Sequence, residues 1–177
     1  MSSIKKSLLR MSIVASSTSL LLISQPASAV PIKPAAALTP TRIINIATKK
    51  CLEVADWSID NGAAIRQWDC TGGANQSWYI VDVYGVNQFT LGNAYTHKCI
   101  DIPGGNAYAG ATLVQWECNY NSNQRFWKYS ASSTGPVFSF QWNRYAIEIG
   151  GFSGANGAPA QLWDTNGGTN QAWYAGD

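Results

Sequence analysis

The tetrapeptide Asn75-Gln76-Ser77-Trp78 (NQSW) occurs three times along this chain in slightly varied form. It returns as NQRF at Asn123-Gln124-Arg125-Phe126 and as NQAW at Asn170-Gln171-Ala172-Trp173. The copies lie 48 and then 47 residues apart. Self-similarity at a nearly constant period of this size indicates copies of one structural unit that stack or share a core.

Other residues keep the same two steps along the sequence. A tryptophan, an acidic residue and a glycine recur at Trp68, Trp116 and Trp163, at Glu53, Asp101 and Glu148, and at Gly62, Gly110 and Gly157. Several independent columns hold one register, so chance is a poor explanation. The sequence therefore contains three repeats.

The hydrophobic pattern within each repeat is typical of strands and not of helices. Apolar residues alternate with polar or small ones, as in half-buried strands, at Ile44 and Ile46, Phe89 and Leu91, and Phe138 and Phe140. Turn signals such as Asn61-Gly62 and Gly104-Gly105 separate these runs. Each unit is too small to bury its own apolar face alone.

Three such units can share one core around a pseudo-threefold axis, which is the arrangement found in a β-trefoil. We therefore predict an all-β fold, a β-trefoil with repeats at about 42–88, 89–136 and 137–177. A parallel β-solenoid is the competing architecture. Its repeats are usually shorter, and three of them would leave both ends open.

We expect residues 1–29 to form a signal peptide that is cleaved on export. Lys5, Lys6 and Arg10 precede a serine-rich apolar run, which ends at the small residues Ala27-Ser28-Ala29. This run is shorter than the ~20 apolar residues of a spanning helix, so we expect no membrane insertion. Residues 30–41 are rich in proline and alanine and read as a lead-in to the domain at 42–177. The protein is expected to be secreted.

Cleavage would change the charge of the protein. The full chain has 12 basic and 10 acidic residues. Three basic residues and no acidic ones leave with the signal peptide, so nine basic residues remain against ten acidic ones. Nucleic-acid binders show a basic stripe along one face, whereas the remaining basic residues are scattered. We expect no nucleic-acid partner.

The four cysteines allow three disulfide pairings, and the repeat chooses between them. Two pairs span 19 residues each, Cys51 with Cys70 and Cys99 with Cys118. Repeat three has Ala146 and Thr165 at the equivalent positions, so both members are absent together. We predict disulfides Cys51–Cys70 and Cys99–Cys118, each worth ~3 kcal/mol in the chain-entropy model, and expect repeat three to hold its loop by packing alone. Zinc would need closer cysteine spacing or histidine support, so we expect no metal.

The residues around these cysteines resemble the ricin B-chain-like (R-type) lectins and related carbohydrate-binding modules. The similarity is carried by Cys51-Leu52-Glu53-Val54, by Ile65-Arg66-Gln67-Trp68-Asp69-Cys70 and by the three Gln-x-aromatic motifs, and it covers about 42–177. It implies a β-trefoil with one shallow sugar pocket per repeat. The sugar-binding residues that it implies are Glu53, Trp68, Asn75 and Gln76 in repeat one, Asp101, Trp116, Asn123 and Gln124 in repeat two, and Glu148, Trp163, Asn170 and Gln171 in repeat three.

The chemistry of these side chains suits a sugar. A pyranose has a face of C–H groups that stacks on an aromatic ring and buries apolar area. Its hydroxyls can donate to a carboxylate, and an asparagine amide both donates and accepts. Nothing in this set requires a metal, and we expect no cofactor.

Repeat two is the best candidate pocket by this comparison. The acid of the family is typically aspartate, which only Asp101 retains, whereas Glu53 and Glu148 are one methylene longer. We expect the aromatic residues of the NQ-x-aromatic motif to be core and the motif glutamines to be mainly structural. The tryptophans at 68, 116 and 163 are expected to be partly exposed platforms. We treat Trp57, Tyr108 and Phe152 as non-equivalent loop residues that extend pockets or cover the barrel.

The sequence does not favour catalysis. Its one histidine, His97, aligns with Lys49 and Arg144 in a turn. The sequence therefore does not indicate a nucleophile–histidine triad. Three acids spread around a threefold arrangement do not form the carboxylate pair of a glycosidase. We expect a secreted lectin, not an enzyme, that binds galactose-type glycans or polysaccharides. The alternatives are a cell-targeting subunit or accessory module for a separate catalytic or toxin chain, and a β-trefoil protease inhibitor.

Overall fold

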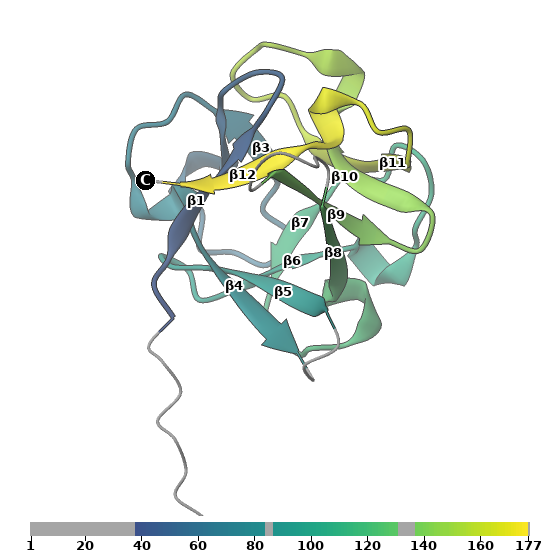
Figure 1. Ribbon diagram of the computed structural model, residues 1–177. Coiled ribbons are helices and arrows are strands. Elements are labelled where there is room, and N and C mark those ends of the chain that lie inside the picture. Colours follow the sequence, from purple (N-terminus) through teal and green to yellow (C-terminus); the bar gives the residue numbers. More distant parts are fainter. Residues whose placement is uncertain (1–37, 84–86, 131–136, 177) are drawn as a thin grey trace, which may run out of the picture. The chain divides into compact units, whose positions relative to one another are not determined.

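Strands and short 3₁₀ turns make up the regular structure of the residues that the structure describes (Figure 1). The computed structural model describes residues 38–83, 87–130 and 137–176, so the predicted signal peptide at 1–29 lies outside the described residues. The described strands are β1 (Thr41–Asn45), β2 (Cys51–Val54), β3 (Ile65–Trp68), β4 (Ser77–Val83), β5 (Gln88–Asn93), β6 (Cys99–Asp101), β7 (Val114–Trp116), β8 (Phe126–Ser130), β9 (Val137–Trp142), β10 (Tyr145–Ile149), β11 (Ala160–Asp164) and β12 (Trp173–Gly176).

Six of the strands close into a barrel. The antiparallel pairs run β1–β4, β4–β5, β5–β8, β8–β9, β9–β12 and back through β12–β1. The first and last repeats meet where β1 and β12 lie side by side, with Ile44 opposite Tyr174 (Figure 1). The other strands form one hairpin per repeat, β2–β3, β6–β7 and β10–β11. This is the predicted β-trefoil.

The motif aromatic residues lie at the centre of the core, as predicted. Trp78, Phe126 and Trp173 are fully buried. The indole Nε1 of Trp78 donates to the carbonyl oxygen of Leu52 at 2.8 Å, and that of Trp173 donates to Ile147 at 3.0 Å. The two buried indole N–H groups therefore have partners, as buried donors require.

The predicted alternation is wrong by one residue in repeat one. Ile43, the equivalent of Leu91 and Phe138, is fully buried in the central cluster, whereas Ile46 lies beyond the end of β1 and is only partly buried. The strand ends at Asn45, whose Oδ1 accepts from the backbone N–H of Ala47 at 3.0 Å. Asn93 makes the same turn in repeat two at 3.0 Å, and the inward-facing positions Ile43, Leu91 and Phe138 are equivalent in the three repeats.

The structure contains the two disulfides that the repeat alignment predicts, Cys51–Cys70 and Cys99–Cys118. Repeat three does not rely on packing alone at the equivalent place. The Thr165 hydroxyl donates to the carbonyl oxygen of Arg144 at 2.7 Å, and the Arg144 guanidinium pairs with Asp164 at 3.1 Å. The hydrogen bond thus stands where the other repeats have a covalent link, whereas ion pairs also occur at this place in the other repeats, Lys50 with Asp69 and Lys98 with Glu117.

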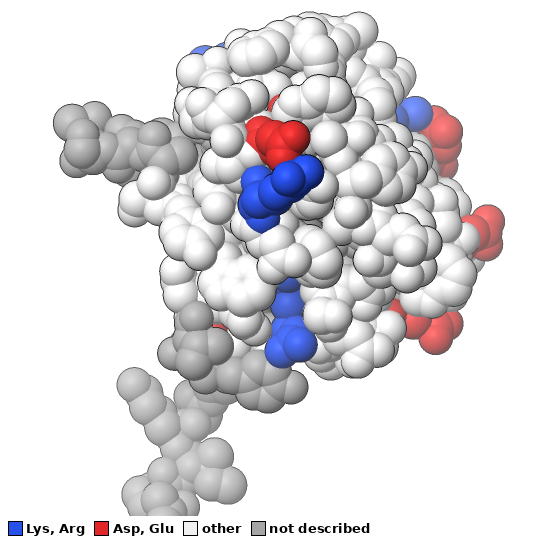
Figure 2. Space-filling view, turned by 90° about the vertical axis from the view of Figure 1, so that its right-hand side faces the viewer, with Lys and Arg blue, Asp and Glu red and all other residues white. Residues whose placement is uncertain are grey.

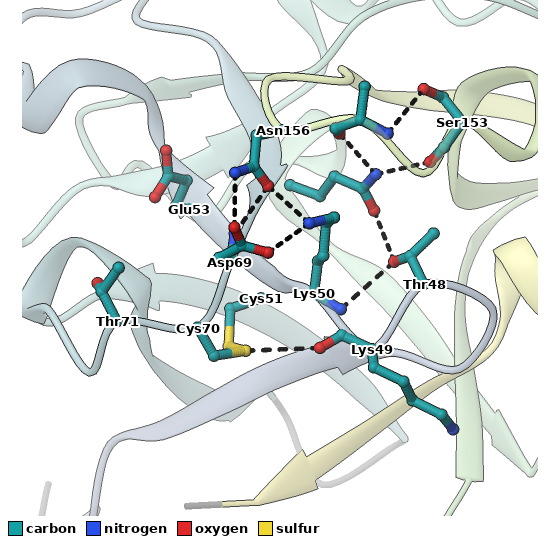
Figure 3. A network of polar contacts seen from close by, with 12 residues as sticks. Thr48, Lys49, Lys50, Cys51, Glu53, Asp69, Cys70, Thr71, Ser153 and Asn156 are labelled. Atoms are coloured by element: carbon teal, nitrogen blue, oxygen red, sulfur yellow. Dashed lines mark hydrogen bonds and ion pairs between the residues drawn. A yellow bond between two sulfur atoms is a disulfide. The ribbon is translucent and has the colours of Figure 1, made fainter.

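Polar side chains join repeat one to repeat three (Figure 3). The Lys50 ammonium contacts the Asp69 carboxylate and donates to Asn156 Oδ1 at 2.8 Å, while Asn156 Nδ2 donates to Asp69 at 2.8 Å. Nearby, Gln67 Nε2 donates to the carbonyl oxygen of Ser153 at 2.6 Å. The loops of one repeat are therefore held by the hairpin of another.

Candidate functional site

The fold brings the predicted acid, ring and amide pair of each repeat to one place. The acid lies on β2, β6 or β10 and the tryptophan on the partner strand β3, β7 or β11. The Asn-Gln pair lies in a 3₁₀ turn just before the core aromatic residue, at Ala74–Gln76, Ser122–Gln124 and Thr169–Gln171. The side-chain amides of the turn point toward the acid, and the aromatic residue two positions after the glutamine enters the core.

One oxygen of each acid accepts from both amides of the pair. In repeat two, Asn123 Nδ2 and Gln124 Nε2 each lie 2.8 Å from Asp101 Oδ2. The longer Glu53 and Glu148 reach the equivalent amides through Oε2, at 3.0 to 3.3 Å in repeat one and 3.0 Å in repeat three. The extra methylene therefore does not detach the acid from its amide pair.

The motif glutamines position the acid and do not face the pocket. Gln124 is fully buried. Its Nε2 also donates to the carbonyl oxygen of Glu117 at 2.9 Å, and its Oε1 accepts from the backbone N–H of Asn119 at 2.8 Å. Gln76 and Gln171 make the same bonds in their repeats. These amides are engaged within the protein, so their direct contact with a sugar is not supported.

The second oxygen of the acid distinguishes the three repeats. In repeat one it accepts from Arg66 Nε at 2.9 Å, and in repeat three from Gln161 Nε2 at 3.0 Å. Repeat two has Val114 at this position, and no donor among the described residues bonds to Asp101 Oδ1. The column of Arg66, Val114 and Gln161 was missed in the sequence because its three members share no chemistry. Its place, facing the acid on the neighbouring strand, is the signal that could have found it.

A cavity of about 410 Å³ lies beside Asp101 in repeat two. It is lined by Gly62, Asp101, Pro103, Gly104, Val114, Trp116, Asn119 and Asn123. The Trp116 side chain is 45% exposed, and its far edge rests 4.0 Å from the position that a Cβ on Gly62 would take. Burial raises the pKa of the Asp101 carboxyl, with hydrogen bonds from Gln124 and Asn123 acting in the opposite direction.

Loop aromatic residues cover the asparagine in the other two repeats. Asn75 and Asn170 are each 2% exposed, whereas Asn123 is half-buried. Trp57 and Phe152 reach the glycine-rich loops beside these two asparagines. Contrary to our expectation, Trp57 and Phe152 are equivalent positions, and repeat two has Gly105 there. Only repeat two leaves its asparagine open.

The remaining residues that we singled out in the sequence differ in their exposure to solvent. Trp163 is 42% exposed, whereas Trp68 is half-buried. Tyr108 is exposed in the loop of repeat two. His97 lies exposed in a turn with a φ of 58°. No cluster of three or more metal-ligating acidic, cysteine or histidine side chains occurs among the described residues.

The fold and these pockets define a β-trefoil protein of lectin-like design. A model of the ricin-type β-trefoil lectin domain matches residues 39–173. The chain therefore belongs to the ricin-type β-trefoil lectin family. Within the part that the structure describes, no helix has the length and apolar character needed to cross a membrane.

Solved structures share the fold. The designed threefold-symmetric protein ThreeFoil is 24% identical, with a TM-score of 0.73 over 78% of this chain and 98% of its own. The ricin B-like lectin of Macrolepiota procera, solved in complex with lactose, is 19% identical, with a TM-score of 0.68 over 80% and 97%. An exo-β-1,3-galactanase from Clostridium thermocellum is 29% identical, with a TM-score of 0.72 over 77% of this chain and 30% of that enzyme.

A sequence relative matches only a short segment. Serine protease 1 of Rarobacter faecitabidus is 40% identical over 37 residues, which is 21% of this chain. The chain spans only 7% of the length of that relative. The match therefore concerns a segment and not the protease as a whole.

Proposed function

We propose that this protein is a secreted lectin that binds uncharged glycans mainly through the pocket of repeat two. The observation that carries the proposal is the free Oδ1 of Asp101 beside the exposed ring of Trp116 in one cavity. A sugar could donate two neighbouring hydroxyls to the carboxylate while its C–H face stacks on the indole. Asn123, half-buried at the rim, supplies an amide for a third hydroxyl.

The charge of the surface supports an uncharged ligand. Figure 2 shows one face of the domain, on which Lys, Arg, Asp and Glu are few and most of the surface is uncharged. In the hairpin ion pairs, Lys50 with Asp69 and Arg144 with Asp164, the positive and the negative charge of each pair cancel locally. An acidic or a basic polymer would find no extended field of opposite sign on this face to steer it.

The proposal predicts that Asp101→Asn weakens glycan binding without unfolding the domain. The new Oδ1 can still accept from Asn123 and Gln124, but an NH₂ group replaces the oxygen that faces the cavity. We expect the affinity for lactose, measured by titration calorimetry, to fall at least tenfold. The binding free energy lost in a tenfold fall is about that of one charge-assisted hydrogen bond. Trp116→Ala should have an effect of similar size.

The matched control is Glu53→Gln, which makes the same change in repeat one. It should leave lactose affinity within a factor of two of the unmodified protein. If the unmodified chain binds neither lactose nor any member of a glycan array, or if Asp101→Asn binds as well as the unmodified chain, the proposal is wrong.

Export and partners form the second part of the proposal. Disulfides persist mainly in oxidising compartments, which supports export, and the small residues Ala27-Ser28-Ala29 suit cleavage behind Ala29. N-terminal sequencing of protein from the culture medium should then begin at Val30. The Haemophilus ducreyi cytolethal distending toxin shares the fold with a TM-score of 0.63 at 15% identity. A second exported chain that co-purifies with this one would favour a cell-targeting role instead of a free lectin.

A further inference from the structure

We propose that Arg66 is an internal ligand that occupies the acid and the ring of the pocket in repeat one, and that the residue at this position controls whether a glycan can reach the acid of each repeat. The inference rests on the proposed function of the pocket in repeat two. It assigns a role to a residue that is neither the acid, the ring nor the amide of a pocket.

The Arg66 guanidinium contacts three groups at once. Its Nε donates to Glu53 Oε1 at 2.9 Å, and a terminal nitrogen donates to Asp56 at 2.9 Å. Its Cζ lies 4.5 Å from the centre of the Trp68 ring. The guanidinium thus bonds to the carboxylate oxygen and stacks on the ring that a sugar in this pocket would use.

Arginine is well matched to these two partners. Its planar group offers several N–H donors in a fixed fork and stacks on aromatic faces. The Arg66 side chain is only 18% exposed and Glu53 is buried, so water screens their ion pair little. Because Arg66 is tethered next to the pocket, its effective concentration there exceeds that of a free sugar. A sugar must displace it to bind.

The other two repeats carry different residues at the same place on the neighbouring strand. In the register of the hairpins, Glu53 lies opposite Arg66, Asp101 opposite Val114 and Glu148 opposite Gln161. Val114 has no donor and leaves Asp101 Oδ1 free. Gln161 occupies Glu148 Oε1 at 3.0 Å, but Trp163 stays 42% exposed. The three pockets are therefore open in repeat two, partly occupied in repeat three and closed in repeat one.

A reciprocal exchange between repeats one and two tests this assignment. In titration calorimetry with lactose on the secreted chain, Arg66→Val should raise the number of bound lactose molecules per chain by one. Val114→Arg should lower affinity at the pocket of repeat two at least tenfold. The double variant should bind again through repeat one, and its binding should be lost with Glu53→Gln instead of Asp101→Asn.

Arg66→Gln is the second variant in case valine leaves Glu53 too poorly paired for stable folding. It reproduces the glutamine of repeat three and removes the cation from the Trp68 ring. Thermal unfolding of each variant separates loss of binding from loss of the fold. The inference is overturned if folded Val114→Arg binds lactose like the unmodified chain, or if folded Arg66→Val and Arg66→Gln both leave the number of sites unchanged.

These outcomes differ from failure of the proposed function. If Asp101→Asn leaves lactose binding intact, the pocket of repeat two is not the glycan site. If Asp101→Asn weakens binding while the Arg66 variants add no site, the pocket of repeat two stands and only the role of Arg66 fails.

Discussion

At the scale of single residues, the two oxygens of Asp101 have separate tasks. Oδ2 accepts from Asn123 and Gln124 and is held in place by them, while Oδ1 has no donor among the described residues and Asp101 lines the cavity. Catalytic and binding carboxylates often combine partial burial with such fixed donors, because a side chain that is already ordered loses less entropy when a ligand binds. In the pocket that we propose, Asp101 is therefore already ordered before a sugar hydroxyl donates to it.

The raised pKa of Asp101 predicts how glycan binding depends on pH. Hydroxyl donors stabilise the carboxylate, so only the ionised form binds well, and affinity should be constant above the pKa and fall as pH drops through it. Because burial raises this pKa, the fall should begin at a higher pH than an ordinary aspartate would give. Lactose titrations at stepwise lower pH would measure it. A flat profile down to the ordinary range of aspartate would contradict the prediction.

The sequence predicted the residues that recur and missed those that vary. The acids, tryptophans and Asn-Gln pairs were found because each column repeats one chemistry, and the structure brings them together in every repeat. The column of Arg66, Val114 and Gln161 determines whether the second carboxylate oxygen of each acid accepts a hydrogen bond. The residue type at this position does not recur between the repeats. Its role becomes visible only when the strand register brings it opposite the acid.

At the scale of elements, repeat three replaces a covalent link with a hydrogen bond. The sulfur atoms of Cys70 and Cys118 lie near the carbonyl oxygens of Lys49 and His97, at 3.8 and 3.5 Å. The Thr165 hydroxyl donates a hydrogen bond to the equivalent carbonyl oxygen, that of Arg144. The joint absence of two cysteines correctly indicated their pairing, but the sequence did not reveal that threonine keeps the same contact.

This equivalence predicts that a third disulfide can be introduced with Ala146→Cys and Thr165→Cys. Ala146 pairs with Trp163 in the register in which Cys51 pairs with Trp68. Closing the loop is worth ~3 kcal/mol, and losing the Thr165 hydroxyl bond costs about 1 kcal/mol. Urea unfolding should show a net gain of about 2 kcal/mol. Thr165→Ala alone should lose about 1 kcal/mol. A variant whose disulfide forms, by mass, without added stability would refute the equivalence.

At the scale of the whole molecule, the barrel makes the three repeats interdependent. Each repeat contributes two barrel strands, and β12 closes the ring on β1. The pockets cross repeat boundaries as well, because the Trp116 ring lies beside Gly62 of repeat one and the Trp163 ring beside Gly110 of repeat two. Three repeats predicted this closure, since an open array would leave unpaired edges. The one-residue shift at Ile43 was not predictable from hydrophobicity, because Ile43 and Ile44 are equally apolar.

Interdependence predicts that damage to the core of repeat three removes binding in repeat two. Trp173→Ala deletes a fully buried indole, which should cost about 3–5 kcal/mol. In urea, circular dichroism and lactose binding should be lost together, at a lower midpoint than in the unmodified protein, because the domain unfolds as one unit. Trp173→Phe copies Phe126 of repeat two and should be milder, since it loses mainly the bond to Ile147. Phe152→Ala, at an exposed ring, should leave the midpoint nearly unchanged. If lactose binding in Trp173→Ala persists beyond the loss of the dichroic signal, repeat two folds on its own and the closed barrel does not couple the repeats.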